Sequence, residues 1–255
     1  LGYFGMPHIL VRFMAVRDEK EMTKSKATAI SWVALSLGFA AFIGVLGRAY
    51  LPELINGNNE KVFIEMIKKV FTVEIPAPFV AGLFLCGILA AIMSTADSQL
   101  LVSASSVAED IFKGLIKKDA DDKTVMKVSR VTVLVVALLA YIIAWNPNNT
   151  VMGLVSNAWA GLGSAFGPLV VMSLYWKRTN FPGAVAGIVT GALTVVIWDY
   201  IPLVGGQTLG KATGLYSLVV GFALGLIAIV AVSLATKAPS EEILQEFEDV
   251  KANRL

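Results

Sequence analysis

The stretch VTVLVVALLAYIIAWNPNNTVMGLVSNAWAGLGSAFGPLVVMSLYW, from Val131 to Trp176, contains no charged residue in 46 positions. A bilayer core accommodates about 20 apolar residues per helix, so this stretch is too long for a single span. The turn-forming sequence Asn146-Pro147-Asn148-Asn149 divides it. The stretch therefore predicts two membrane-spanning helices joined by a short turn.

Apolar residues occupy 56% of the 255 positions and charged residues 16%, whereas soluble domains have roughly 45 to 50% and about 25%. A soluble core cannot bury that excess. We expect an all-α, polytopic membrane helix bundle over residues 1–236 and a tail over 237–255. The bundle would comprise the end of one broken helix at the start of the chain and six spans, at 27–47, 75–108, 125–145, 150–176, 181–200 and 212–236.

The basic residues are distributed unevenly between the loops. If every block spans once, one set of loops holds 16 of the 21 Lys and Arg residues, at 12–26, 113–130, 177–178 and 237–254, and the other set holds five. By the positive-inside rule, the richer set faces the cytoplasm. We therefore expect an inner (plasma) membrane protein with a cytoplasmic C-terminus.

Three segments between or after the spans have patterns of their own. Apolar residues repeat at helical spacing from Val62 to Phe71 in the longest external loop, which predicts a helix that either lies at the membrane interface or covers a transport pathway. The mixed charges of 109–130 predict a solvated connector. Ser240 and the residues after it predict a short, capped amphipathic helix in the tail.

Glycines recur at four-residue spacing in the last three spans. Small residues on one helix face let backbones approach closely in lipid, where no hydrophobic force drives helices together. The pattern predicts a tightly packed bundle and carries no information on function. The residues concerned are Gly163, Gly167, Gly183, Gly187, Gly191, Gly221 and Gly225.

The inner half of the second span carries the polar side chains of greatest interest. At about 100° per residue, Ser94, Thr95, Asp97 and Ser98 share an arc of roughly 160°, and Ala91 lies one turn earlier on the same side. Hydroxyls and backbone carbonyls are the oxygen donors that hard cations such as sodium prefer. This arrangement predicts an ion site.

A structural interpretation of the same residues is equally open. Hydroxyls in membrane helices often donate to the carbonyl four residues earlier, and Asp97 could be hydrated near the cytoplasm. Because an ionisable side chain within a span costs roughly 2.5 to 3.5 kcal/mol on insertion scales, Asp97 should in any case face protein, water or an ion.

The opening sequence Gly2-Tyr3-Phe4-Gly5-Met6-Pro7 places two glycines and a proline in an apolar run. These residues break helices, and irregular backbone at membrane depth occurs only where it is buried in protein or lines a cavity. Transporters bind their substrates at such breaks. The alternative is a helix that begins or ends at an ordinary loop.

Enzymatic chemistry has little support. His8 is the only histidine and Cys86 the only cysteine, and the chain contains neither HExxH nor a GxxxxGK[ST] loop. We therefore expect a protein that is not an enzyme.

Three segments, at Gly2 to Ala15, Ala90 to Val102 and Asn157 to Pro168, resemble the sodium:solute symporter family, and within it the members that carry proline. The likeness extends in order over essentially the whole chain. It implies the C-terminal half of a five-plus-five inverted-repeat fold, so we expect that an N-terminal half of the same chain is missing.

The resemblance also assigns roles to residues. It implies sodium ligands at the Ala91 carbonyl and at the hydroxyls of Ser94 and Thr95. Tyr3 and Pro7 match substrate-site positions. Ser94, Asp97 and Ser98 match positions whose hydroxyls hold a second sodium in a relative. Since Asp97 puts a carboxylate in place of one hydroxyl, a second cation or a proton is a candidate at Asp97 and Ser98.

We accordingly expect sodium-coupled symport of a small solute, with L-proline as first choice. Alternatives within the class are pantothenate, a sugar or an organic acid, and outside it a sensor or channel on a transporter scaffold. The expected partners are this substrate, sodium, the lipid bilayer and the missing half of the chain, with no nucleic acid.

The orientation can be tested with a membrane-impermeant thiol reagent on intact cells. In a Cys86→Ser background, Lys69→Cys should be labelled and Lys118→Cys should not, because the charge distribution puts the first outside and the second inside. Labelling of both after permeabilisation is the control for reactivity. Labelling at Lys118→Cys alone on intact cells would reverse the proposed orientation.

Overall fold

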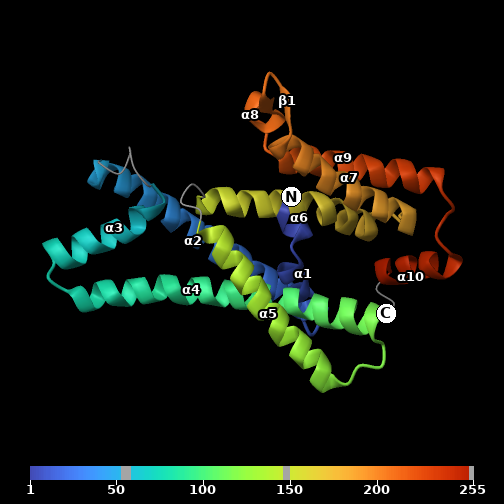
Figure 1. Cartoon of the computed structure of the whole chain (residues 1–255), viewed down its shortest axis with the longest axis horizontal. Helices are drawn as coiled ribbons and strands as arrows, with labels where there is room; N and C mark the ends of the chain where they lie inside the picture. Colours follow the sequence, from blue (N-terminus) through green and yellow to red (C-terminus); the bar gives the residue numbers. More distant parts are fainter. Residues whose placement is uncertain (53–58, 146–149, 253–255) are drawn as a thin grey trace. The chain divides into compact units, whose positions relative to one another are not determined.

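The computed structural model of the chain describes residues 1–52, 59–145 and 150–252. The chain divides into two compact units, one formed by Leu1–Met14 with Pro147–Leu255 and the other by Ala15–Asn146. Nearly all of the described backbone is helical (Figure 1). Within the described ranges six helices are long and apolar enough to cross a membrane, at Glu21–Tyr50, Pro78–Ile116, Asp122–Ala144, Val151–Tyr175, Phe181–Tyr200 and Ser217–Ala235.

Each of these six helices overlaps one of the predicted spans. The expectation of an all-α, polytopic membrane bundle is thereby confirmed. The turn expected at 146–149 lies outside the described residues.

The first unit contains three long helices that pack side by side (Figure 1). These are α6 (Val151–Tyr175), α7 (Phe181–Tyr200) and α9 (Ser217–Ala235). The unit's shorter elements are η1 (Gly2–Gly5), α1 (Pro7–Met14), β1 (Pro202–Val204), β2 (Gln207–Thr208), α8 (Leu209–Thr213) and α10 (Glu241–Lys251).

Glycines form the contact surface between the three long helices, as the four-residue spacing predicted. A Cβ on Gly187 would overlap the Ile229 side chain, and one on Gly183 would overlap the Ser233 hydroxyl. A Cβ on Gly221 would lie 2.5 Å from the Ser164 hydroxyl oxygen. The backbones are therefore closer together than any larger residue at these positions would permit.

The Ser164 carbonyl lies at the centre of this contact. Pro168, four residues later in α6, has no N–H and cannot donate the helical hydrogen bond that this oxygen would otherwise accept. A Cβ on Gly191 would overlap the oxygen, so the hydrogen in its place points at it and makes a Cα–H···O contact. The Ser164 hydroxyl donates to the Leu218 carbonyl of α9 at 3.3 Å. Ser164 thus joins α6 to both neighbours.

Polar side chains near the N-terminus of α7 form hydrogen bonds with the C-terminus of α9. Asn180 caps α7 by accepting from the Gly183 N–H at 3.0 Å, while its amide donates to the Thr236 hydroxyl at 2.8 Å. Arg178 donates to the Thr236 carbonyl at 2.8 Å, which satisfies a carbonyl at the C-terminus of α9. The same end holds α10, the helix predicted in the tail.

Helix α10 is capped by a serine and makes an exposed ion pair with Lys177. The Ser240 hydroxyl accepts from the Ile243 N–H at 3.5 Å. Lys177 contacts the Glu248 carboxylate at 3.0 Å, and this hydrogen bond and charge lower the pKa of Glu248 below its ordinary value.

The link between α7 and α9 is a small hairpin followed by α8. Gly205 and Gly206 have φ of 57° and 78° between β1 and β2, the left-handed conformation that tight hairpin turns require. The Ser217 hydroxyl donates to the Asp199 carboxylate at 2.5 Å and closes this link onto α7.

The second unit consists of long helices and the segments that join them. Its elements are α2 (Glu19–Tyr50), η3 (Asn59–Lys61), α3 (Val62–Lys68), η4 (Lys69–Glu74), α4 (Pro78–Ser105), η5 (Ser106–Ile116) and α5 (Asp122–Ala144), of which η4 and η5 are π-helical.

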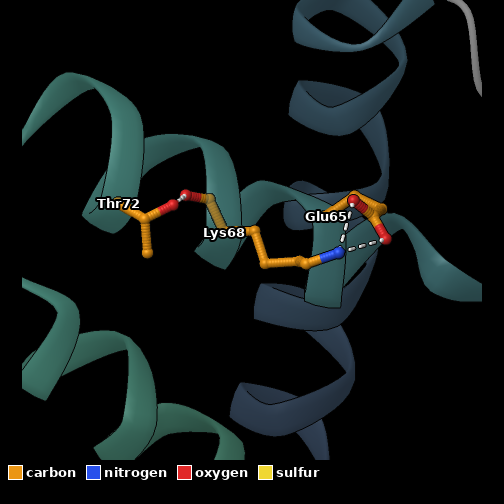
Figure 2. Close-up of polar contacts among 3 residues, drawn as sticks. All are labelled: Glu65, Lys68 and Thr72. Carbon is orange, nitrogen blue, oxygen red and sulfur yellow. Dashed lines mark hydrogen bonds and ion pairs between the residues drawn. The ribbon is translucent and has the colours of Figure 1, made fainter.

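Helix α3 with η4 is the helix predicted between Val62 and Phe71. A Cβ on Gly47 would overlap Val62, so α3 lies directly against α2, and Phe71 stacks on Phe84 of α4 with ring centroids 5.3 Å apart. Lys68 contacts Glu65 at 3.3 Å, and the Thr72 hydroxyl donates to the Lys68 carbonyl where the backbone passes into the π-helix (Figure 2). Ile67 is thus buried, whereas Phe63 and Ile64 are exposed.

The connector expected at 109–130 is helical over most of its length, and most of its residues are exposed, as expected of a solvated segment. The helix continues beyond Ser105 as η5 to Ile116, and α5 already begins at Asp122. Ala108, Ala120 and Val125 are buried together with Phe112 and Val128 against them. The apolar residues of η5 recur at helical spacing, and it is the mixed charges among them that favoured a connector in the sequence.

Gly191→Ala should destabilise the first unit by roughly 1 to 3 kcal/mol, because the new methyl group overlaps the Ser164 carbonyl oxygen. The matched control is Gly161→Ala on α6, where a Cβ meets nothing within 4 Å and helix propensity favours alanine. The thermal midpoint of the purified full-length protein in detergent should fall only for Gly191→Ala. Equal midpoints for both variants would contradict the close approach.

Candidate functional site

The predicted ion ligands lie together on α4. The helix is continuous through Ala91, Ser94, Thr95, Asp97 and Ser98, so these residues keep the shared arc that the sequence indicated. The first four are exposed along the chain's own surface, and Ser98 is half-buried.

Two of the hydroxyls donate to the carbonyl four residues earlier, as the structural interpretation of these residues expects. The Thr95 hydroxyl donates to the Ala91 carbonyl at 3.2 Å, and the Ser98 hydroxyl donates to the Ser94 carbonyl at 3.0 Å. Among the described residues the Ser94 hydroxyl has no hydrogen-bond partner. Self-satisfaction therefore accounts for Thr95 and Ser98, and it does not account for Ser94.

The Thr95 hydrogen bond also places the Thr95 hydroxyl oxygen and the Ala91 carbonyl oxygen at a separation that lets both bind one cation. Two oxygens 3.2 Å apart, each roughly 2.3 to 2.6 Å from one hard cation, subtend about 75 to 90° at that cation. Such an angle is normal between neighbouring ligands. The Ala91 carbonyl and Thr95 hydroxyl can thus face one ion after a rotation of the hydroxyl hydrogen, and the donor set fits sodium chemically.

The other predicted site lies where the helical backbone is interrupted near the start of the chain. Residues Gly2–Gly5 form one 3₁₀ turn, Met6 is extended with φ of −94° and ψ of 107°, and α1 starts at Pro7. Proline suits a first helical position because its missing N–H would have no helical partner there. The helix-breaking residues therefore produce the irregular segment that the sequence predicted.

This segment lies directly on α6. A Cβ on Gly2 would lie 2.5 Å from the Trp159 ring, and one on Gly5 would overlap the Leu162 carbonyl. Only glycine permits these approaches. Two of the segments that carry the family resemblance, at the start of the chain and at 157–168, are thus in contact.

Tyr3 extends from the break beside an aromatic partner. Its ring packs edge-on against Trp159, with centroids 4.9 Å apart and planes at 84°. The Tyr3 side chain is nevertheless 56% exposed, so a ligand can reach it. Sequence reasoning missed Trp159. The only signal for it was its position in the 157–168 segment, four residues before Gly163.

The two candidate sites belong to different units. Tyr3 and Pro7 lie in the unit that contains α6, α7 and α9, whereas the oxygens of Ala91, Ser94 and Thr95 lie in the other. The roles of all these residues, and of Asp97 and Ser98, remain predictions.

The chain matches known proteins over nearly its whole length. Residues 1–191 match the model of the sodium:solute symporter family. The chain is 41% identical to the high-affinity proline transporter PutP of Bacillus subtilis over 251 residues, which cover 98% of the chain and 50% of that protein. It is 43% identical to the sodium/proline symporter of Escherichia coli over 259 aligned residues, covering 99% and 49%.

The osmoregulated proline transporter OpuE of Bacillus subtilis is 42% identical over 247 residues, which cover 97% of the chain and 48% of that protein. The chain thus spans about half the length of the curated relatives that it matches. With a family match over 191 residues and six helices able to cross a membrane, the chain belongs to the sodium:solute symporter family.

Proposed function

We propose that the protein containing this chain takes up L-proline together with sodium ions that move down their gradient. Family membership supports sodium coupling, and the names of three relatives support proline as the substrate. The observation that carries the mechanism is the pair of α4 oxygens, Thr95 Oγ1 and the Ala91 carbonyl, held 3.2 Å apart on an arc of oxygen donors.

In this proposal the Ala91 carbonyl and the Ser94 and Thr95 hydroxyls bind sodium. Neutral oxygens suit a monovalent ion because they stabilise it without adding a net negative charge that would hold it too firmly. Dissociation of the ion lets the Thr95 hydroxyl return to its hydrogen bond with Ala91. The site then has a satisfied resting arrangement, which favours reversible binding.

The exposed polar arc of α4, from Ala91 to Ser98, must be shielded from the lipid hydrocarbon by other protein segments. Asp97 lies on it, and a carboxylate facing hydrocarbon would be unfavourable. Because the relatives are about twice as long as this chain, segments from the other half of the protein are the natural source of that cover and of further sodium ligands. Asp97 and Ser98 could then serve a second cation or a proton.

The solute would bind at the break between η1 and α1. A zwitterionic amino acid requires partners for a carboxylate and an ammonium group, and irregular backbone provides unpaired amides and carbonyls for both. The exposed Tyr3 ring, fixed against Trp159, would pack against the pyrrolidine ring. Pro7 would fix where the helix resumes.

The C-terminus and α10 would face the cytoplasm, in keeping with the charge distribution of the loops. Labelled-proline uptake into vesicles containing the full-length protein, with and without an inward sodium gradient, tests the whole proposal. Uptake of pantothenate, a sugar or an organic acid in place of proline would retain the mechanism and change the substrate. Ion conduction without solute would instead indicate a channel.

Tyr3→Ala should raise the half-saturating proline concentration more than the half-saturating sodium concentration, because the ring would contact the solute and not the ion. Tyr3→Phe retains the packing against Trp159 and is the matched control, with a smaller change expected. Uptake measured over both concentration ranges distinguishes the two effects. Small and equal changes in Tyr3→Ala would assign the residue to an ordinary loop.

Ser94→Ala and Thr95→Ala should each weaken sodium binding by about 1.5 to 3 kcal/mol, or roughly 10-fold to 150-fold, since each removes one hydroxyl from the ion's shell. Coupling between two ligands is reciprocal, so proline binding should weaken at low sodium and recover at high sodium. The measurement is the sodium dependence of uptake at matched expression.

Ser103→Ala is the matched control for this pair. The Ser103 hydroxyl also donates to the carbonyl four residues earlier, at 2.8 Å from Gln99, but it lies roughly 180° round α4 from Ser94. The control should leave the sodium dependence unchanged. If Ser94→Ala and Thr95→Ala behave like Ser103→Ala, the hydroxyls serve the helix alone.

A further inference from the structure

One face of α5 carries exposed side chains along its whole length. At about 100° per residue these side chains share an arc of roughly 80°. They change in kind along the helix, from basic at its start to apolar in the middle and aromatic at its end. In order they are Lys123, Lys127, Arg130, Leu134, Leu138, Tyr141 and Trp145, and all are exposed.

In the first two turns of α5, the opposite face packs within the unit. Val125 is buried with Ala108 and Ala120, and Val128 packs against the same cluster. These two valines lie roughly 180° and 120° round the helix from the centre of the exposed arc. The basic residues therefore do not face the neighbouring elements of their own unit.

The three basic side chains line a shallow groove with Met126 and Asp122. Asp122 does not neutralise them, because its carboxylate contacts Lys113 at 3.6 Å and lies roughly 100° round the helix from Lys123. Among the residues that the structure describes, Lys123, Lys127 and Arg130 have no acidic partner within ion-pair distance. Three basic side chains and one carboxylate thus line a partly apolar groove that keeps a net positive charge.

The length of the face matches a bilayer. Lys127 and Trp145 are 18 residues apart, or about 27 Å along the axis, close to the roughly 30 Å of the hydrocarbon core. Tyr141 and Trp145 pack edge-on, with centroids 5.3 Å apart, at the depth where aromatic side chains gather at a membrane interface. The apolar leucines lie between the two ends, so the basic groove falls at the level of the lipid headgroups.

We propose that the Lys123, Lys127 and Arg130 groove binds the headgroup of an anionic phospholipid in the leaflet at the start of α5, with the acyl chains along Leu134 and Leu138. Arg130 and Lys127 would pair with the phosphate and a second acidic group, and Lys123 would lie at the outer edge. Long basic side chains reach such a layer while their methylene groups remain on apolar surface. Each charge near an anionic surface strengthens binding about fivefold.

The test uses the full-length protein in phosphatidylcholine membranes containing spin-labelled phosphatidylglycerol or spin-labelled phosphatidylcholine. The triple variant Lys123→Gln, Lys127→Gln and Arg130→Gln should lose the part of the phosphatidylglycerol preference of the motionally restricted lipid that comes from this one site. The control Lys118→Gln, Lys237→Gln and Lys251→Gln removes the same charge from other exposed positions and should retain the preference. An equal reduction in both triple variants would overturn the proposal.

A second measurement does not depend on insertion of the charge-deleted protein. Met126→Cys, in a Cys86→Ser background and labelled with a benzophenone reagent, should cross-link to phosphatidylglycerol in preference to phosphatidylcholine. Val128→Cys, on the packed face, should cross-link mainly to protein. Cross-linking of Met126→Cys to protein in place of lipid would also overturn the proposal, since it would mean that another segment covers the groove.

Discussion

Hydrocarbon forms no hydrogen bonds, so every backbone group that this chain takes into a membrane must be satisfied by protein. Regular helices meet that constraint by themselves, and the chain departs from them at few places within its apolar stretches. At Pro168 a helical donor is missing, and the Ser164 carbonyl is met by glycines of the neighbouring helices. At Gly2–Met6 the helix is interrupted, and the irregular turn packs closely against α6. Glycine is required at both places because only a residue without a side chain permits the contact.

The two candidate sites use this constraint in opposite ways. Along α4 the backbone stays regular, and the chemistry comes from side-chain hydroxyls that rest on carbonyls of their own helix. Between η1 and α1 the backbone itself becomes available, and an aromatic pair fixes the adjacent side chain. A small cation needs a few oxygens at close range, whereas a zwitterion needs donors and acceptors some distance apart. The two backbone arrangements suit these two kinds of ligand.

Much of the fold follows from the sequence because membrane spans and glycine spacing are local patterns. The six helices could be predicted from the lengths of the charge-free stretches alone. The close packing at Gly183, Gly187 and Gly191 could be predicted from their four-residue spacing. The pairing of Tyr3 with Trp159 depends on residues 156 positions apart, so no local pattern reveals it. The helical continuation to Ile116 was missed because the mixed charges of 109–130 were given more weight than the apolar residues that recur at helical spacing up to Ile116. The site residues were predicted from hydroxyl clustering and family resemblance, and their roles await the measurements.

The glycine contacts between α6, α7 and α9 have a mechanical consequence. Helices that meet through large side chains can slide, because rotamers adjust as the axes shift. At Gly191 and Gly225 backbone faces backbone and no side chain can adjust, since a Cβ on Gly225 would already lie 3.2 Å from the Ser164 carbonyl oxygen. A relative shift of one helix would withdraw the contact from an oxygen that has no helical donor. These three helices should therefore move as one rigid block, with bending confined to the links between them and other parts of the protein.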